Sequence, residues 1–123
     1  MSKELVEKAE RAAEKAYAPY SNYHVGAVVL MNDGTEFTGV NVENAAYPLT
    51  QCAEKTALGA AAAAGYRPGD VAAAGINASP CGGCRQWFFE WRVPEISFRR
   101  RDGSIATYAA SDLLPDTWEL PAS

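Results

Sequence analysis

The sequence predicts an α/β fold: a three-layer α-β-α sandwich with a five-stranded mixed sheet, in one small domain. Three observations predict it. Segments typical of strands alternate with helical segments, no internal repeat or long linker interrupts them, and 123 residues are enough for one core but not two. We therefore expect a single domain over residues 1–123, with helices on both faces of the sheet.

The first half of the chain predicts two helices around a hairpin. Charged residues alternate with leucine, valine and alanine over residues 2–17, which indicates an amphipathic helix that ends before Pro19. Two strand-like segments within residues 24–42 flank a turn at residues 32–34 and predict a β-hairpin. Residues 52–66 then predict a second, alanine-rich helix.

The second half continues the alternation of strands and helices. Residues 71–78 are apolar enough to form a buried strand, and residues 81–91 predict a third helix. The remaining segments are two strands and a terminal loop or short helix, over residues 95–100, 104–110 and 113–118.

Charge and composition narrow the class of partner. The formal net charge is −4 and the only dense basic run is FRRRDG, residues 98–103, which argues against nucleic-acid binding because that affinity depends on neutralised phosphates. No apolar run approaches the ~20 residues of a membrane span, and the charged N-terminal segment is unlike a signal peptide. Three cysteines, an odd number, favour a reducing compartment over a disulfide framework. We therefore expect a cytoplasmic protein that binds neither nucleic acid nor membrane.

The three cysteines stand where two helices are predicted to begin. Cys52 precedes the second helix, and Cys81 and Cys84 open the third in the stretch SPCGGCRQ. Helix N-termini present unpaired N–H groups and the positive end of the dipole, which stabilise thiolates. Three thiolates from two helix starts can converge on one zinc ion and leave its fourth tetrahedral position open.

Three interpretations of these cysteines compete. A redox pair would use Cys81 and Cys84 and leave Cys52 unexplained. A structural zinc site needs a fourth protein ligand, and the only histidine, His24, lies at a strand start where a solvated or hydrogen-bonded role is commoner. An open catalytic zinc site uses all three cysteines and gives a role to Glu54, although the helix dipole alone would explain an acid in a first turn.

Five short blocks of the sequence form a longer pattern. C-A-E followed by P-C-G-G-C matches the signature of zinc-dependent base and nucleoside deaminases, with cysteine at the first ligand position. The blocks APYSNYHVGA, GVNVENAAYP, CAEKTALGA, SPCGGCRQ and DLLPDTW together resemble the small homotetrameric cytidine deaminases, from about residue 17 to 118. The resemblance implies zinc-dependent hydrolytic deamination of cytidine and deoxycytidine to uridine and deoxyuridine in pyrimidine salvage, by a homotetramer. The alanine-rich stretch LGAAAAAG would let helices approach closely in such an assembly.

That reaction has physical requirements which these residues can meet. Deamination of a 4-aminopyrimidine needs a nucleophile at C4, a proton on N3 and a proton on the leaving amine. Zinc lowers the pKa of bound water from ~15.7 toward ~7, so zinc-bound hydroxide can attack C4 at neutral pH. Glu54 is the acid beside a predicted ligand, and we expect it to shuttle the protons. By resemblance, the backbone around Ser79 and Cys81, held rigid by Pro80, binds the leaving amine and the oxyanion.

The resemblance also assigns contacts to the substrate. Asn41 and Glu43 match residues that hydrogen-bond the ribose. Without the resemblance, they would be interpreted as a strand-end asparagine and a surface acid. A ligand that lacks the hydroxyl would leave these two side chains without hydrogen-bond partners, so we expect it to bind more weakly. The other expected contacts are Tyr23, Ala53, Tyr47 and Trp118, of which Tyr47 and Trp118 match aromatic positions that reach a neighbouring subunit's site.

The sequence departs from the family pattern in three places. Lys55 follows Glu54 where the family usually has an arginine that offsets the charge of three thiolates, and Arg85 or the helix dipoles could share that task. Trp118 replaces a phenylalanine, and the aromatic run that contains Trp87 replaces aliphatic residues. These departures leave two alternatives open: a deaminase of a modified aminopyrimidine nucleoside, such as a nucleoside antibiotic or an N4-substituted cytidine, and a non-enzymatic structural zinc-binding module.

Overall fold

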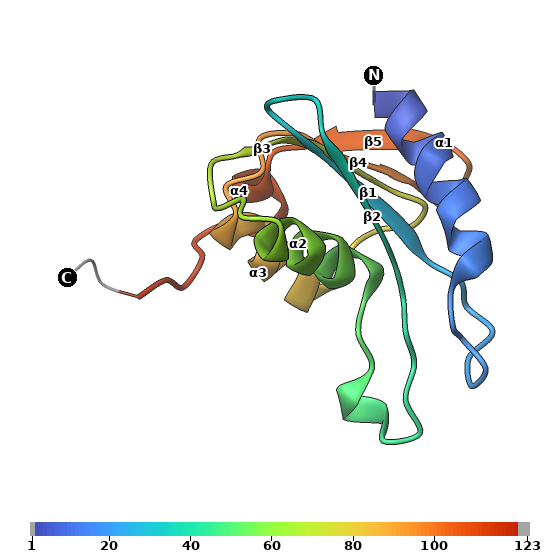
Figure 1. Cartoon of the computed structure of the whole chain (residues 1–123). Helices are drawn as coiled ribbons and strands as arrows, with labels where there is room; N and C mark the ends of the chain where they lie inside the picture. The colour runs from blue at the N-terminus through green and yellow to red at the C-terminus, as the bar shows by residue number, and fades with distance from the viewer. Residues whose placement is uncertain (1, 121–123) are drawn as a thin grey trace.

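A five-stranded mixed sheet with the strand order β2-β1-β3-β4-β5 organises the chain (Figure 1). The computed structural model describes residues 2–120. The strands are β1 (Gly26–Met31), β2 (Glu36–Val40), β3 (Val71–Ile76), β4 (Ile96–Arg99) and β5 (Ile105–Tyr108). The helices are α1 (Ser2–Ala12), α2 (Ala53–Ala63), α3 (Gly82–Glu90) and α4 (Ala110–Leu113), with 3-10 turns η1 (Ala13–Lys15) and η2 (Tyr47–Leu49).

The connections determine which strand ends meet. β1 pairs antiparallel with both β2 and β3, and β5 pairs antiparallel with β4. β3 and β4 are parallel, with Ala74 opposite Ile96, and α3 forms the crossover between them. The carboxyl ends of β3 and β4 therefore lie at the same edge of the sheet, where α3 begins. The mixed five-stranded sheet predicted from the sequence is confirmed.

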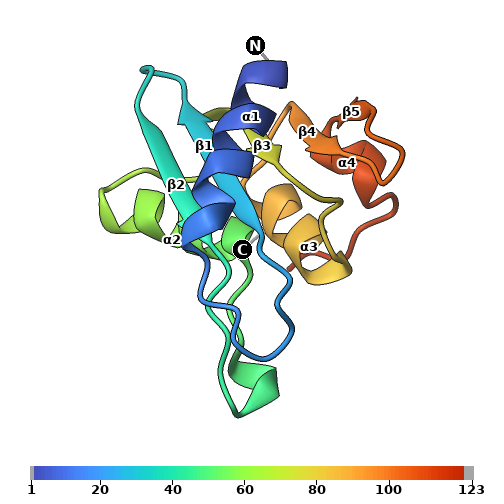
Figure 2. The same ribbon diagram turned by 90° about the vertical axis from the view of Figure 1, so that its right-hand side faces the viewer.

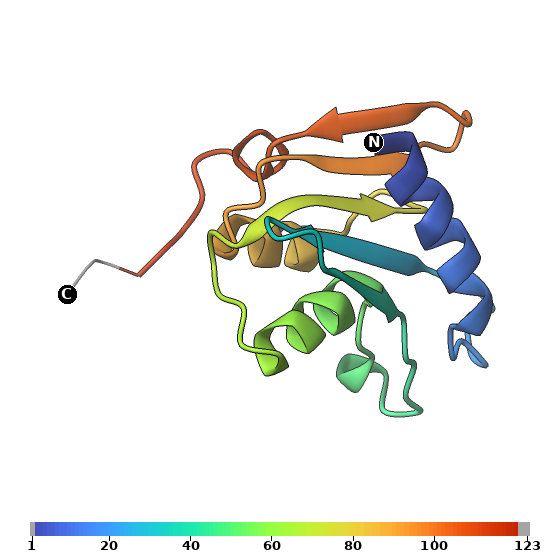
Figure 3. The same ribbon diagram turned by 45° about the horizontal axis from the view of Figure 1, so that its top comes forward.

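Helices cover both faces of this sheet, as Figures 2 and 3 show. α1 packs Leu5 and Ala9 against Val28 and Ala73 on one face. α2 and α3 cover the other face, where Phe88 is fully buried in the larger core cluster. Because successive strand residues point to opposite faces, β1 contributes to both cores. The predicted three-layer α-β-α arrangement is confirmed.

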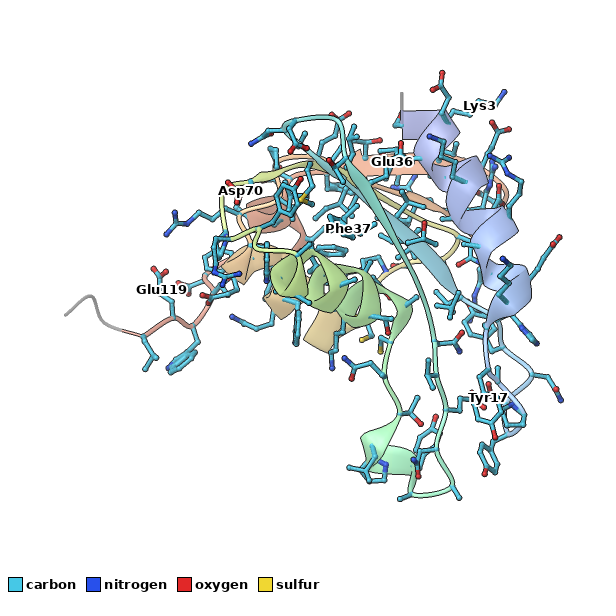
Figure 4. The ribbon with its side chains drawn as sticks, viewed as in Figure 1. Lys3, Tyr17, Glu36, Phe37, Asp70 and Glu119 are labelled. Carbon is cyan, nitrogen blue, oxygen red and sulfur yellow. The ribbon has the colours of Figure 1, made fainter. Side chains whose placement is uncertain are left out.

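Gly39 of β2 lets α2 lie unusually close to the sheet. A methyl group at Gly39 would lie 2.5 Å from the backbone nitrogen of Ala57, a separation that real Cβ atoms do not show. Phe37 of β2 (labelled in Figure 4) packs edge-on against Tyr66, which follows the end of α2, at a centroid distance of 5.5 Å. The start of α2 is thus held at a fixed depth over the sheet.

The element boundaries differ from the sequence-based expectation at two points. The first helix ends at Ala12 and continues as η1, short of the predicted residue 17. The last strand ends at Tyr108 and residues 110–113 form α4, because Pro115 prevents further helix. The segment after α4 projects from the body of the molecule (Figure 1). Within residues 2–120, every helix is too short or too polar to traverse a bilayer.

Candidate active site

The starts of α2 and α3 bring the three cysteines together. Cys52 and Cys81 are the N-cap residues of α2 and α3, and Cys84 lies in the first turn of α3. Their three sulfur atoms all lie within 4.8 Å of one another. Tetrahedral zinc with Zn–S bonds of about 2.3 Å requires sulfur separations of roughly 3.8 Å, so small rotations of the side chains satisfy it. The donor set and the geometry fit a zinc ion.

The thiols differ in burial and in acidity. Cys84 is buried, Cys52 is half-buried and Cys81 is exposed, with its sulfur accepting the backbone N–H of Cys84 at 3.5 Å. The Cys84 thiol lowers the pKa of Cys52 to about 6 by hydrogen bonding to its sulfur. The same interaction, together with burial, raises the pKa of Cys84. One thiolate is therefore already favoured near neutral pH, as metal binding requires.

Glu54 stands in the first turn of α2, beside this cluster. Its side chain is only 4% exposed, and burial raises the pKa of the carboxyl. A raised pKa makes a carboxylate a stronger base, which suits a group that must take up a proton and release it again. An acid that only interacts favourably with the helix dipole could remain exposed. The burial of Glu54 therefore favours a role in the site.

A cavity of about 410 Å³ opens between the helix starts and two loops. It is lined by Ser21, Tyr23, Val25, Asn41, Glu43, Tyr47, Thr50, Cys52, Glu54, Ala78, Ser79 and Cys81. The structure therefore brings together most of the site residues expected from the sequence. Its volume lies in the range of small-molecule sites.

Glu43, in the loop after β2, lines the same cavity as Glu54. It is 6% exposed, and its carboxylate accepts the backbone N–H groups of Tyr20 at 2.9 Å and Ser21 at 3.1 Å. The Ser21 hydroxyl also donates to it and lowers the pKa of Glu43. Glu43 is thus a buried, ionised acceptor and not the surface side chain that the sequence alone suggested.

Asn41 also lines this cavity. Its Oδ1 accepts the backbone N–H of Val25 at 2.9 Å, and its Nδ2 donates to the carbonyl of Tyr23 at 2.8 Å. An amide has two N–H donors and two lone pairs on oxygen, so one of each remains for a ligand. Asn41 is buried at the end of β2, where both interpretations of it, strand end and ligand contact, are compatible.

Arg85 binds the loop that precedes Cys81. Its guanidinium donates to the carbonyl of Pro80 at 2.9 Å, to the Ser79 hydroxyl at 3.1 Å and to the carbonyl of Leu113 at 3.1 Å. All three nitrogens of the guanidinium are engaged in these bonds. The side chain therefore fixes the Ser79–Pro80 backbone and joins α4 to it, a role that the sequence did not indicate.

Lys55 points toward the cysteines. A methyl group at Gly83 would lie 3.7 Å from Lys55 Nζ and 3.9 Å from Cys81 Sγ, so the ammonium and the sulfur flank the same glycine. Its charge contributes to the lowered pKa of Cys52, after the larger effect of the Cys84 thiol. The positive charge expected beside the ligands is thus supplied by Lys55.

The other predicted site residues lie outside the cavity lining. Ala53, the first residue of α2, is fully buried. Trp87, a departure from the family pattern and not a predicted site residue, packs against the larger core. Trp118 is 71% exposed on the projecting C-terminal segment, which also carries Glu119 (Figure 4). Within one chain, Trp118 makes no wall of the cavity.

Sequence reasoning missed four residues that line the cavity: Ser21, Val25, Thr50 and Ala78. Ser21 was detectable as the polar residue of the APYSNYHVGA block, next to the expected ligand contact Tyr23. Val25, Thr50 and Ala78 carry no chemical signal of their own. They enter the site because the loops bring them there.

Comparison with known proteins is decisive at this point. A family model for the cytidine and deoxycytidylate deaminase zinc-binding region matches residues 1–100. This chain belongs to that family. It is 42% identical over 119 residues to a cytidine deaminase of Halalkalibacterium halodurans, covering 90% of this chain and 89% of that protein.

Solved structures agree with this membership. A crystal structure of cytidine deaminase from Burkholderia pseudomallei superposes with a TM-score of 0.89 at 47% identity, covering 96% of this chain and 99% of that one. Cytidine deaminase from Mycobacterium tuberculosis superposes with a TM-score of 0.81 at 36% identity, covering 96% and 97%. The cytidine deaminase fold therefore covers nearly the whole chain, and the cysteine cluster is suited to bind the zinc ion of this family.

Proposed function

We propose that this protein is a zinc-dependent cytidine deaminase that converts cytidine and deoxycytidine to uridine and deoxyuridine. The observation that carries the proposal is one cavity lined by two cysteines of the sulfur cluster, by Glu54 and by the pair Asn41 and Glu43. A zinc site, a proton-transfer group and hydroxyl-binding groups thus face the same space. Family membership supports the same reaction.

The sulfurs of Cys52, Cys81 and Cys84 are the groups that hold the metal. Zinc bound there supplies a Lewis acid that makes water nucleophilic at neutral pH. A set of three protein ligands is typical of catalytic zinc, whereas structural zinc sites usually have four. Among residues 2–120, the only metal-binding group of three or more side chains is this set of cysteines, which disfavours a structural zinc module.

Glu54 moves the protons of the reaction. As water adds to C4 of the pyrimidine ring, the Glu54 carboxylate takes a proton and delivers it to N3. It then takes the second proton and gives it to the leaving amine, so that ammonia departs and a carbonyl forms at C4. The raised pKa of Glu54 keeps both directions of transfer accessible.

The loop wall binds the sugar. Glu43, ionised and held by residues 20 and 21, accepts a hydrogen bond from a ribose hydroxyl, and the remaining N–H of Asn41 donates one. Ser79 and the backbone near Pro80, fixed by Arg85, face the reacting end of the base. A ligand that lacks the hydroxyl leaves buried polar groups unpaired and binds more weakly.

We further propose a cytoplasmic homotetramer that acts in pyrimidine salvage. Two large side chains of η2 are exposed in the single chain: Tyr47, which lines the cavity, is 71% exposed, and Leu49 is 70% exposed. Trp118 projects on the C-terminal segment, far more exposed than a tryptophan usually is. Neighbouring subunits that cover these side chains would complete each site.

The experiment that tests the function follows the absorbance change of the zinc-loaded protein with four substrates side by side. Cytidine, deoxycytidine, cytosine and an N4-substituted cytidine separate the ordinary nucleoside reaction from that of a modified aminopyrimidine. We expect turnover of the two nucleosides and little of free cytosine. Turnover of the N4-substituted compound alone would favour the modified-nucleoside alternative, and no turnover of any of them contradicts deamination.

A further inference from the structure

A second cavity adjoins the nucleoside cavity and has no part in the proposed reaction. It encloses about 720 Å³ and shares Tyr23, Ala78 and Ser79 with its neighbour, so the two spaces are separated by three residues. It lies beside the carboxyl ends of the parallel strands β3 and β4, because residues 77–79 and 98–101 line it. Open α/β sheets commonly bind ligands outside the carboxyl ends of such strands.

Four arginines line this groove, and two of them are committed elsewhere. Arg85 uses its guanidinium on the Ser79–Pro80 loop and on Leu113. Arg99 points to the opposite face of the sheet, where it forms an ion pair with Glu10 of α1 at 3.1 Å. These two arginines give the groove its shape and little free charge.

Arg100 and Arg101 supply the free charge. Both come from the FRRRDG run, which the proposed deaminase reaction does not use. Arg100 donates one hydrogen bond from Nη2 to the Tyr108 hydroxyl at 2.9 Å, which leaves its other donors available. Within residues 2–120, neither arginine takes part in an ion pair, and Asp112 is the one acidic residue in the groove lining.

The floor of the groove is aromatic. Phe98 and Tyr108 lie on the same face of the β4–β5 hairpin, with their rings stacked at a centroid distance of 6.1 Å and an interplanar angle of 18°. Tyr108 also orients Arg100 through its hydroxyl. A guanidinium held in this way directs its planar fork of N–H donors at one place, which suits the oxygens of a phosphoryl group.

We infer that Arg100 and Arg101 form a binding site for a phosphoryl group, next to the nucleoside cavity. The protein has a net charge of −4, but the two free guanidinium groups make this groove locally positive. The phosphoryl group is carried either by a nucleotide whose nucleoside part extends into the adjoining cavity, or by free phosphate. The site goes beyond the deaminase reaction, and its occupancy is measured by binding, so it can fail while the proposed function stands.

Calorimetric titration of the zinc-loaded protein tests the site with three probes: uridine, uridine 5′-monophosphate and inorganic phosphate. The uridine compounds lack the amino group and are not turned over. If a nucleotide is the source, uridine 5′-monophosphate binds at least about tenfold more tightly than uridine at low salt, and Arg100→Gln/Arg101→Gln removes that preference without weakening uridine. If free phosphate is the ligand, inorganic phosphate binds the parent protein even when uridine is already bound, and the same double variant no longer binds phosphate.

Arg11→Gln/Arg92→Gln is the matched control, because both arginines are exposed and neither lines the groove. It removes the same total charge and should change each affinity less than twofold. The inference is overturned if neither phosphate-bearing probe shows a groove-dependent affinity, or if the control variant loses as much as the groove variant. Should the double variant fold poorly, Arg101→Gln alone, on an exposed turn residue, is expected to lose about half of the effect in logarithmic terms and retains the test.

Discussion

Glu43 and Glu54 are two buried carboxyl groups that face one cavity, yet their environments drive their acidities apart. Glu54 is buried at the start of α2, beside the cysteines, and this burial raises its pKa. Glu43 accepts hydrogen bonds from residues 20 and 21, and the Ser21 hydroxyl lowers its pKa. The difference separates a group that exchanges protons from one that holds a fixed charge.

The same contrast applies to the two walls that carry these acids. The helix wall consists of the starts of α2 and α3, placed against the sheet by buried contacts. The loop wall consists of residues 20–25 and 41–50, held by side-chain hydrogen bonds and flanked by exposed aromatic residues. We expect changes in the helix wall to alter metal content and the chemical step, and changes in the loop wall to alter binding.

The largest effect should come from the cysteines. Replacement of Cys84 by serine removes the buried ligand of the cluster, and we expect zinc content to fall from about one per chain to near zero, with loss of all activity. Metal analysis of Cys52→Ser, Cys81→Ser and Cys84→Ser checks this, with Thr50→Ser as a control in the cavity lining. Full zinc retention in all three cysteine variants would remove the metal assignment.

Glu54→Gln should keep zinc and fold while kcat falls by several orders of magnitude. Proton transfer by a positioned side chain contributes roughly 10²- to 10⁴-fold, and this reaction uses the same group more than once. Parallel measurement of kcat and of zinc content distinguishes loss of chemistry from loss of metal. Near-normal turnover would contradict the role of Glu54 and weaken the contrast with Glu43.

Glu43→Gln should act mainly on KM. Loss of the charged acceptor weakens the hydrogen bond to the sugar and loosens residues 20 and 21, and we expect KM to rise about 10- to 100-fold with a smaller change in kcat. Ser21→Ala, which keeps the carboxylate and removes one donor, should show a smaller rise. A fall in kcat equal to that of Glu54→Gln would show that the two acids do not have separate roles.

Lys55 offers the smallest and most specific change. Three thiolates on Zn²⁺ carry a net charge of −1, which a neighbouring cation offsets. We expect Lys55→Ala to speed zinc removal by a chelator several-fold and Lys55→Arg to slow it, because a guanidinium can bond two sulfurs at once. Lys15→Ala, a change at an exposed lysine of η1, is the control. Unchanged rates in both Lys55 variants would assign charge compensation to the helix dipoles.

The sequence predicted the order of strands and helices and the position of the three cysteines at helix starts. These features depend on periodicity and local helix signals, which are readable residue by residue. It also indicated that Glu54 lies beside the cysteines, because the residue is in the first turn of α2, two positions after Cys52.

The loop wall was much less predictable. The bonds from residues 20 and 21 to Glu43, and from Asn41 to residues 23 and 25, join segments that are 16 to 23 residues apart. Nothing local in the sequence specifies such pairs. The hydrogen bond from Arg85 to the carbonyl of Leu113 was missed for the same reason, because Leu113 lies 28 residues further along the chain.

Gly39 has a consequence for anyone who wishes to redesign this enzyme. The glycine lies under the first turn of α2, and any larger residue would push that turn, with Cys52 and Glu54, away from the sheet. A combinatorial library aimed at bulkier or differently substituted nucleosides should therefore leave Gly39 untouched. Diversity belongs instead at Tyr23 and Tyr47, which line the same cavity and are 62% and 71% exposed.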